Sequence, residues 1–153
     1  MRREGGGRKV TNGWVQIGFG GLKIWSIKEV GWYWEKRPDL LNAWLQGSAG
    51  YTRKVTDDKY FVYGAKQDPI HIRNEYLAGA LEISEDIEEV YLLNPQIVTS
   101  EGEWEAWLFG AKLPGANRFR SFRELMEAER YRVLETIQVS WNWDRKQEAR
   151  GQL

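Results

Sequence analysis

The chain has few side chains suited to acid–base or metal chemistry. His71 is the single histidine among 153 residues, and there is no cysteine. A Ser-His-Asp site needs marked partners for its histidine, and a zinc site needs several imidazole or thiolate ligands. We therefore expect His71 to be an ordinary residue of a strand. We also expect no disulfide, no metal site and no cofactor.

Three glutamates offer the main alternative for catalysis. Glu101, Glu103 and Glu105 alternate along the chain, so in a strand they share one face. Residues two apart on a strand lie about 6.5–7 Å apart, a distance compatible with the carboxylate pair of an inverting glycosidase. Such an enzyme also needs one carboxyl group with a raised pKa, and nothing in the sequence marks either glutamate as buried. A small carboxylate-dependent enzyme is therefore the minor reading, and we expect no catalysis.

Charge is balanced over the whole chain but clustered locally. Lysine plus arginine and aspartate plus glutamate number 22 each, so the general attraction to phosphate backbones is lacking and nucleic acid is not an expected partner. The middle of the chain is acidic, either as solvated turns or as a patch that steers a basic partner. This acidic cluster consists of Glu82, Glu85, Asp86, Glu88 and Glu89.

Nine tryptophans give the chain unusually large side chains to bury or to present. Trp25, Trp44 and Trp104 fall at core positions by periodicity. Trp32 and Trp34 lie in the loop-like stretch GWYWEK, and exposed aromatics beside charges are typical of protein interfaces. The alternative is that these two cap the edges of the core.

Residues 103–109 (EWEAWLF) alternate as a strand does. Trp104, Ala106 and Leu108 form the face expected in the core, and the opposite face places Trp107 beside two carboxylates. We interpret that opposite face as a contact surface. The predicted partner-binding residues are Glu103, Glu105, Trp107, Glu85, Asp86, Glu88, Trp32 and Trp34.

The elements that position these residues are strands in the middle and helices on either side. Strands are predicted at 22–27, 59–63 (a central strand), 70–76, 80–84 and 89–93, the last stopped by Asn94-Pro95. Helices are predicted near 38–47, with Pro38 in the first turn, and at 121–138, where Ser121 and Glu124 form a capping box. This order predicts an α+β fold, an antiparallel meander with helices packed on one face.

A single domain is expected over residues 11–140. Residues 1–10 are basic and glycine-rich and are predicted to be disordered, and residues 141–153 are predicted to be a loosely held tail. No apolar run is long enough to span a bilayer, and no leader opens the chain, so we expect no membrane association and a cytoplasmic protein.

Several short motifs follow one another along the chain. They are 11–14 (TNGW), 90–95 (VYLLNP), 102–107 (GEWEAW), 113–116 (LPGA) and 121–126 (SFRELM). With these motifs the chain is similar to the Smi/Knr-type family of the SUKH superfamily over about residues 11–130. Members usually carry an amphipathic helix before the first motif, and residues 1–9 do not supply one, so we expect either an N-terminally clipped chain or a misassigned start codon.

The resemblance implies a role in binding proteins. Bacterial members of the superfamily are immunity proteins that neutralise toxins, often nucleases, and fungal members are regulators of cell-wall synthesis. We therefore expect a non-catalytic domain that binds and occludes a toxin domain. A regulatory scaffold of cell-wall synthesis is the alternative.

Overall fold

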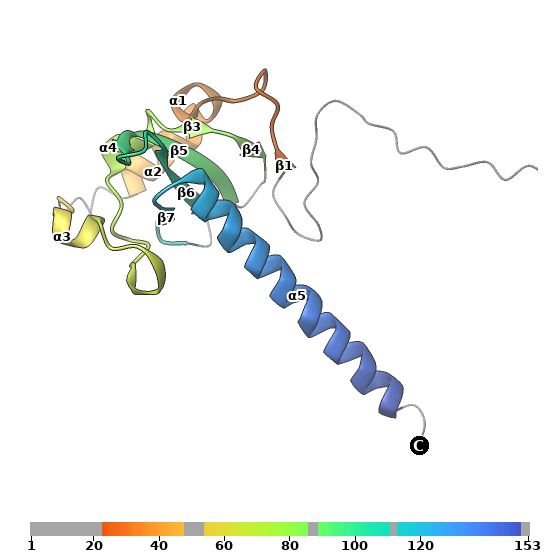
Figure 1. The fold of residues 1–153 in the computed structure, drawn as a ribbon. Helices are drawn as coiled ribbons and strands as arrows, with labels where there is room; N and C mark the ends of the chain where they lie inside the picture. Colours follow the sequence, from red (N-terminus) through yellow and green to blue (C-terminus); the bar gives the residue numbers. More distant parts are fainter. Residues whose placement is uncertain (1–22, 48–53, 86–88, 111–112, 151–153) are drawn as a thin grey trace, which may run out of the picture.

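The computed structural model describes residues 23–47, 54–85, 89–110 and 113–150 (Figure 1). Its centre is a five-stranded sheet, antiparallel throughout, with the order β2-β3-β5-β6-β7. Sequential strands β5, β6 and β7 are neighbours, which is a meander, and the predicted α+β class is confirmed. The strands are β2 (Gly31–Trp32), β3 (Leu81–Glu82), β5 (Glu89–Val98), β6 (Trp104–Gly110) and β7 (Ala116–Phe119), with β1 (Lys23–Ile24) and β4 (Ser84–Glu85) forming a separate pair.

Helices cover both faces of the sheet, and not one face as predicted. On the first face, Tyr60 and Leu77 from the short helices pack with Trp107 and Phe109 of β6. On the second face, Leu125 packs with Ala106 and Leu108. The first face carries α1 (Tyr33–Lys36), α2 (Pro38–Gly47), α3 (Asp57–Tyr60), the 3₁₀ turn η2 (Gly64–Lys66) and α4 (Asn74–Leu77), and the second carries α5 (Phe122–Arg150).

Strands β5 and β6 form the longest hairpin of the described chain. Its turn closes where the Gly102 amide donates to the Thr99 carbonyl, and Gly102 has a φ of +83°, which glycine adopts without strain. The strand predicted to stop at Asn94-Pro95 instead continues to Val98 across a register shift. Proline is tolerated in such a bulge because its missing N–H costs no ladder hydrogen bond there.

The strands predicted at 59–63 and 70–76 are wrong. Residues 57–60 form the helix α3, and residues 74–77 form the helix α4. The signal for α3 was the acidic pair Asp57 and Asp58 after Thr56, a pattern that favours a helix start, yet the aromatic run that follows has strand propensity. The strand expected at 22–27 is reduced to β1, and Leu22 lies outside the described residues.

The two long helices begin as predicted. Pro38 is the first residue of α2, and the Ser121 hydroxyl accepts from the Glu124 amide at 3.2 Å at the start of α5. The Glu124 carboxylate accepts from the Arg120 amide instead of closing the capping box on Ser121. α5 was expected to end near 138 but extends to Arg150, so residues 141–150 are helical. Within the described ranges, no helix combines the length and the apolar character needed to cross a bilayer.

Candidate binding surface

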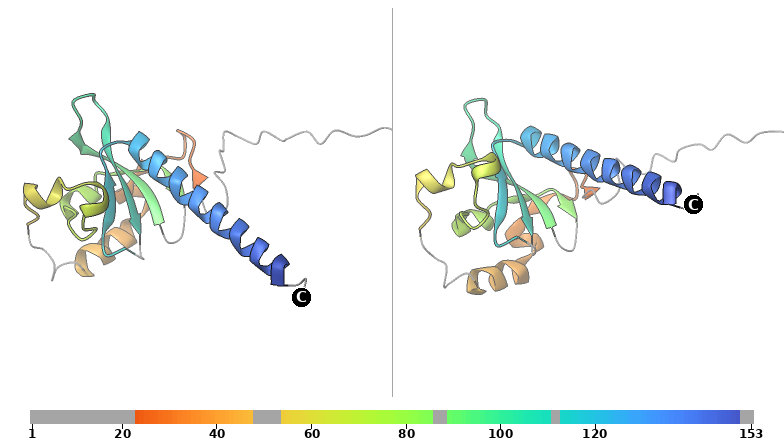
Figure 2. Two further views of the ribbon diagram at one scale, coloured as in Figure 1. Left: turned by 60° about the horizontal axis from the view of Figure 1, so that its bottom comes forward. Right: turned by 90° about the horizontal axis from the view of Figure 1, so that it is seen from below.

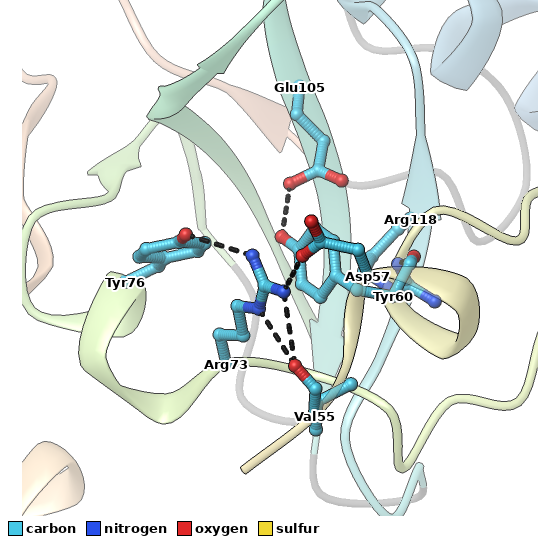
Figure 3. A network of polar contacts seen from close by, with 7 residues as sticks. All are labelled: Val55, Asp57, Tyr60, Arg73, Tyr76, Glu105 and Arg118. Atoms are coloured by element: carbon cyan, nitrogen blue, oxygen red, sulfur yellow. Dashed lines mark hydrogen bonds and ion pairs between the residues drawn. The ribbon is translucent and has the colours of Figure 1, made fainter.

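Glu105 is the centre of a polar network inside the first face. It lies on β6 with no exposed surface, and three donors converge on Oε2: Tyr60 Oη at 2.6 Å, Trp107 Nε1 at 2.8 Å and Asn94 Nδ2 at 2.9 Å. Tyr63 Oη donates to Oε1 at 2.8 Å. Figure 3 shows the Tyr60 contact below the carboxylate.

This network leaves Glu105 no room for a substrate. Four protein donors converge on this carboxylate, three of them at Oε2, and the side chain has no exposed surface through which a substrate could reach it. Burial raises the pKa of Tyr60 and of Tyr63 above the ordinary value, and the charge of Glu105 raises both further, so both phenols remain donors. Glu105 is therefore a structural acceptor, with no acid–base role available to it in this conformation.

The predicted exposure of Glu105 and Trp107 is wrong. Both side chains are wholly buried, so neither can contact a partner in this conformation. The alternation correctly placed them on one face of β6, but that face is covered by α3 and its neighbours. The donors Tyr60 and Tyr63 come from more than forty residues away in the chain, and no local pattern announces them.

Two arginines fasten the covering segment to the sheet. Arg118 of β7 stacks on the Tyr60 ring at 4.6 Å and donates to the Val62 carbonyl at 3.3 Å and to the Tyr60 carbonyl. Arg73 stacks on the same ring at 4.6 Å and donates to the Val55 carbonyl, with Asp57 and Tyr76 as further partners (Figure 3). The aromatic ring is thus held between two cations, which keeps α3 against the sheet.

The acidic cluster is only partly described, and its described members are paired. Glu82 is wholly buried and accepts from Arg37 Nε at 3.0 Å and Nη2 at 2.9 Å. Glu89 Oε2 lies 3.7 Å from Nη1 of Arg132 in α5. Glu85 lies in β4 without a described side chain, and the predicted site residues Asp86 and Glu88 fall outside the described residues.

An open pocket lies on the second face, at the end of the β5–β6 hairpin and the start of α5. Its volume is about 350 Å³, and Trp104 and Phe122 in its wall are 37% and 38% exposed. Trp104, expected in the core, therefore faces solvent in part. Val98, which pairs with Trp104 across the hairpin and shares its face, is 52% exposed. The lining residues are Leu93, Gly102, Glu103, Trp104 and Phe122.

The pocket continues across the sheet as an apolar strip. Leu93 pairs with Leu81 on β3, and Leu81 pairs with Trp32 on β2, so these three side chains point to the same face. Trp32 is 37% exposed, and Leu81 and Leu93 are half-buried. We call Trp32, Leu81, Leu93, Trp104 and Phe122 the apolar strip. Exposed Glu101 and Glu103 lie at its hairpin end.

Three predicted site residues can be placed on the described surface. Glu103 lines the pocket, and Trp32 forms the other end of the strip. Trp34 is 51% exposed, but it belongs to α1, on the opposite face. Phe122 was not among the predicted site residues, and Trp104 was expected in the core. The position of Trp104 along its strand could have indicated its exposure, since a strand residue next to a hairpin turn extends beyond the helix that covers the middle of the strand.

A scan against protein-family models, a search of curated proteins and a search of solved structures each found no match for this chain.

Proposed function

We propose that this chain is a non-catalytic protein-binding domain whose contact surface is the apolar strip. The observation that supports this most is the partial exposure of Trp104 and Phe122 around an open pocket, with Trp32 on the same face two strands away from Leu93. Partly exposed aromatics grouped in one patch are the usual anchors of protein interfaces. The best-positioned carboxylate, Glu105, is sealed in the core.

The charge beside the strip favours a basic partner. Glu101 and Glu103 are exposed at its hairpin end. A nuclease must present a positive surface to the phosphate backbone, and carboxylates opposite that surface would steer the encounter. With the resemblance to the SUKH superfamily, this supports an immunity-type role in which the strip occludes a toxin domain.

The proposal predicts a toxin domain encoded immediately upstream of the gene, and it is tested by co-expressing the chain with that domain. Wild-type protein should restore growth, whereas Trp104→Ala and Glu103→Lys should not. Trp34→Ala is the matched control, because it removes an equally large exposed indole from the opposite face and should still protect. All variants should first give the wild-type thermal melt.

Protection that survives Trp104→Ala and Glu103→Lys but is lost in Trp34→Ala would place the contact surface elsewhere. Absence of protection, together with binding to envelope proteins, would replace the immunity role with the cell-wall scaffold.

A further inference from the structure

The pocket at the hairpin end of the apolar strip combines two aromatic walls with one carboxylate. Trp104 of β6 and Phe122 of α5 are 37% and 38% exposed, and Leu93 of β5 completes the apolar part of the lining. Glu103 is the one charged residue of the lining, and Arg123, which follows Phe122, is exposed outside it. Figure 2 shows the β5–β6 hairpin reaching beyond the rest of the sheet close to the first turn of α5. The pocket is thus accessible to a partner at this end of the sheet.

The hairpin turn fixes the backbone of Glu103. The Glu103 amide donates to Thr99 Oγ1 at 3.1 Å, and the Glu103 carbonyl accepts from the Thr99 amide at 2.8 Å. Within the described ranges, no ion pair engages the Glu103 carboxylate. A carboxylate on a fixed turn, beside two partly exposed rings, is therefore available to a cation.

The start of α5, which also borders the pocket, has its own partners within the chain. The Ser121 hydroxyl accepts from the Glu124 amide at 3.2 Å, and the Ser121 carbonyl accepts from the Leu125 amide at 3.1 Å. The Glu124 carboxylate, in the first turn, accepts from the Arg120 amide and pairs with the Arg120 side chain at 3.0 Å. A capping side chain and an acidic first turn offset the positive end of the helix dipole. The charge that selects an occupant of the pocket is therefore that of Glu103.

We propose that this pocket binds an arginine side chain of the protein partner. The inference rests on the proposed function and names the group that the apolar strip recognises. Arginine has an apolar stem that packs on aliphatic and aromatic walls, and a planar cation that stacks on an indole or phenyl face. Its fork of N–H donors matches a carboxylate such as Glu103 better than the compact ammonium of lysine does. A volume of about 350 Å³ is at the lower end for ligand pockets and suits one long side chain.

The shape of the pocket favours a side chain presented by a partner over a free small molecule. Sites for small molecules enclose most of the ligand surface. Here the two aromatic walls are themselves 37% and 38% exposed, so an occupant is covered on one side only. The protein surface from which the arginine projects would close the other side. A surface built to bind phosphate backbones is rich in such arginines.

The test uses the full chain and the probe Nα-acetyl-L-arginine amide, followed by NMR through the indole N–H signals. The Trp104 signal is assigned from its loss in Trp104→Phe. It should shift saturably, with a dissociation constant on the order of millimolar, as expected for one side chain. The signal of Trp34, an exposed indole on the opposite face, should not shift. The citrulline analogue has the same shape without the charge and should bind about tenfold more weakly.

Two variants separate the carboxylate from general charge. Glu103→Gln should weaken binding of the probe about fivefold, because it removes the ion pair and keeps the size of the side chain. Glu75→Gln makes the same change at an exposed glutamate of α4, on the first face, and should bind as wild type does. An unshifted Trp104 signal, equal binding of the arginine and citrulline probes, or equal affinities of the two variants would overturn the inference.

This inference and the proposed function fail separately. Protection from the toxin that depends on Trp104, without any response to the arginine probe, would overturn the inference and leave the proposed function in place. A saturable response to the probe that depends on Glu103, without any protection, would overturn the immunity role and leave the pocket as an arginine site.

Discussion

Glu105 shows how a charged residue can stabilise the interior of this sheet. Its carboxylate lies within 2.9 Å of four donors from three separate segments, and it has no exposed surface. Hydrogen bonds to a charged group are among the stronger ones, and a buried donor left without its acceptor is costly. The network therefore stabilises the packing of α3 on the sheet.

Replacing this carboxylate by an amide should destabilise the fold. In Glu105→Gln, the new amide group would add a donor where donors already converge, and we expect the free energy of unfolding to fall by about 3 kcal/mol. Chemical denaturation measures the change. Glu103→Gln is the control on the exposed side of the hairpin and should stay within about 0.5 kcal/mol of wild type. Equal stability of the two variants would contradict the role given to Glu105.

Buried phenols should make the fold sensitive to alkaline pH. Burial, with the nearby charge of Glu82, raises the pKa of Tyr33 from 10.0 to about 12. Burial also raises the pKa values of Tyr60, Tyr63 and Tyr91, each beside a carboxylate. The unfolded chain loses these protons first, so their stabilising contribution is complete below pH 10 and is lost as the pH rises toward the folded values.

Each such phenol contributes a slope of up to about 1.4 kcal/mol per pH unit in that window. Denaturant titrations at a series of alkaline pH values should therefore show a steep loss of stability. Tyr91→Phe removes one titrating group, so the free energy of unfolding of this variant should fall less steeply with pH than that of the wild type. A free energy of unfolding that stays constant above pH 10 would show that these phenols ionise equally in the folded and unfolded chain.

At the scale of single residues, the sequence predicted which side chains share a face of a strand better than it predicted which side chains are exposed. The alternation in 103–109 grouped Glu105 with Trp107 and separated both from Trp104, and the structure agrees. Period-two spacing fixes which side chains share a face, but it does not say which elements cover that face. With helices on both faces, the polar side was the more deeply buried one.

Among the elements, α5 is held to the sheet by a buried carboxylate within its own stripe. Glu129, which interrupts the apolar pattern of the helix, is 6% exposed and accepts from Tyr91 Oη at 2.6 Å. Arg132 donates to the same oxygen at 2.6 Å and also approaches Glu89 of β5. The break in the apolar stripe is therefore the attachment point of the helix to the second face.

A double-mutant cycle on Tyr91→Phe and Glu129→Gln should reveal this attachment. Because the two side chains share a buried hydrogen bond, we expect their effects on the free energy of unfolding to be non-additive by about 1–2 kcal/mol. Thr136→Ala in place of Glu129→Gln provides a control pair, since the Thr136 hydroxyl donates to the Arg132 carbonyl of its own helix. Additive effects in the Tyr91–Glu129 cycle would mean that the contact does not couple α5 to the sheet.

Element types followed from the sequence where local signals agreed. Pro38 and the Ser121 cap predicted the starts of α2 and α5, and the 89–93 and 103–109 patterns predicted the two strands that the structure pairs as the central hairpin. The strand predicted at 59–63 is wrong because aromatic residues favour strands while the preceding acidic pair favours a helix. The helix prevails through tertiary contacts of Tyr60 with Glu105, Arg73 and Arg118.

For the whole molecule, the two faces of the sheet differ in how completely they are covered. The first face is closed by α1 to α4 around Trp107 and Glu105. Among the described helices, α5 is the one that packs on the second face, and its far half projects beyond the sheet (Figure 1). The apolar strip lies on this same face. The order of elements predicted the α+β class, but which face is left open depends on the direction of a helix, and no local pattern encodes it.

The proposed function predicts a toxin domain encoded next to the gene, and the most direct test is the affinity of the chain for that domain, measured by calorimetry with Trp104→Ala and Trp34→Ala. Loss of a central interface indole costs about 2 kcal/mol or more, so Trp104→Ala should weaken binding by about thirtyfold while Trp34→Ala leaves it unchanged. Wild-type affinity in Trp104→Ala, with loss in Trp34→Ala, would contradict the claim that the apolar strip is the contact surface.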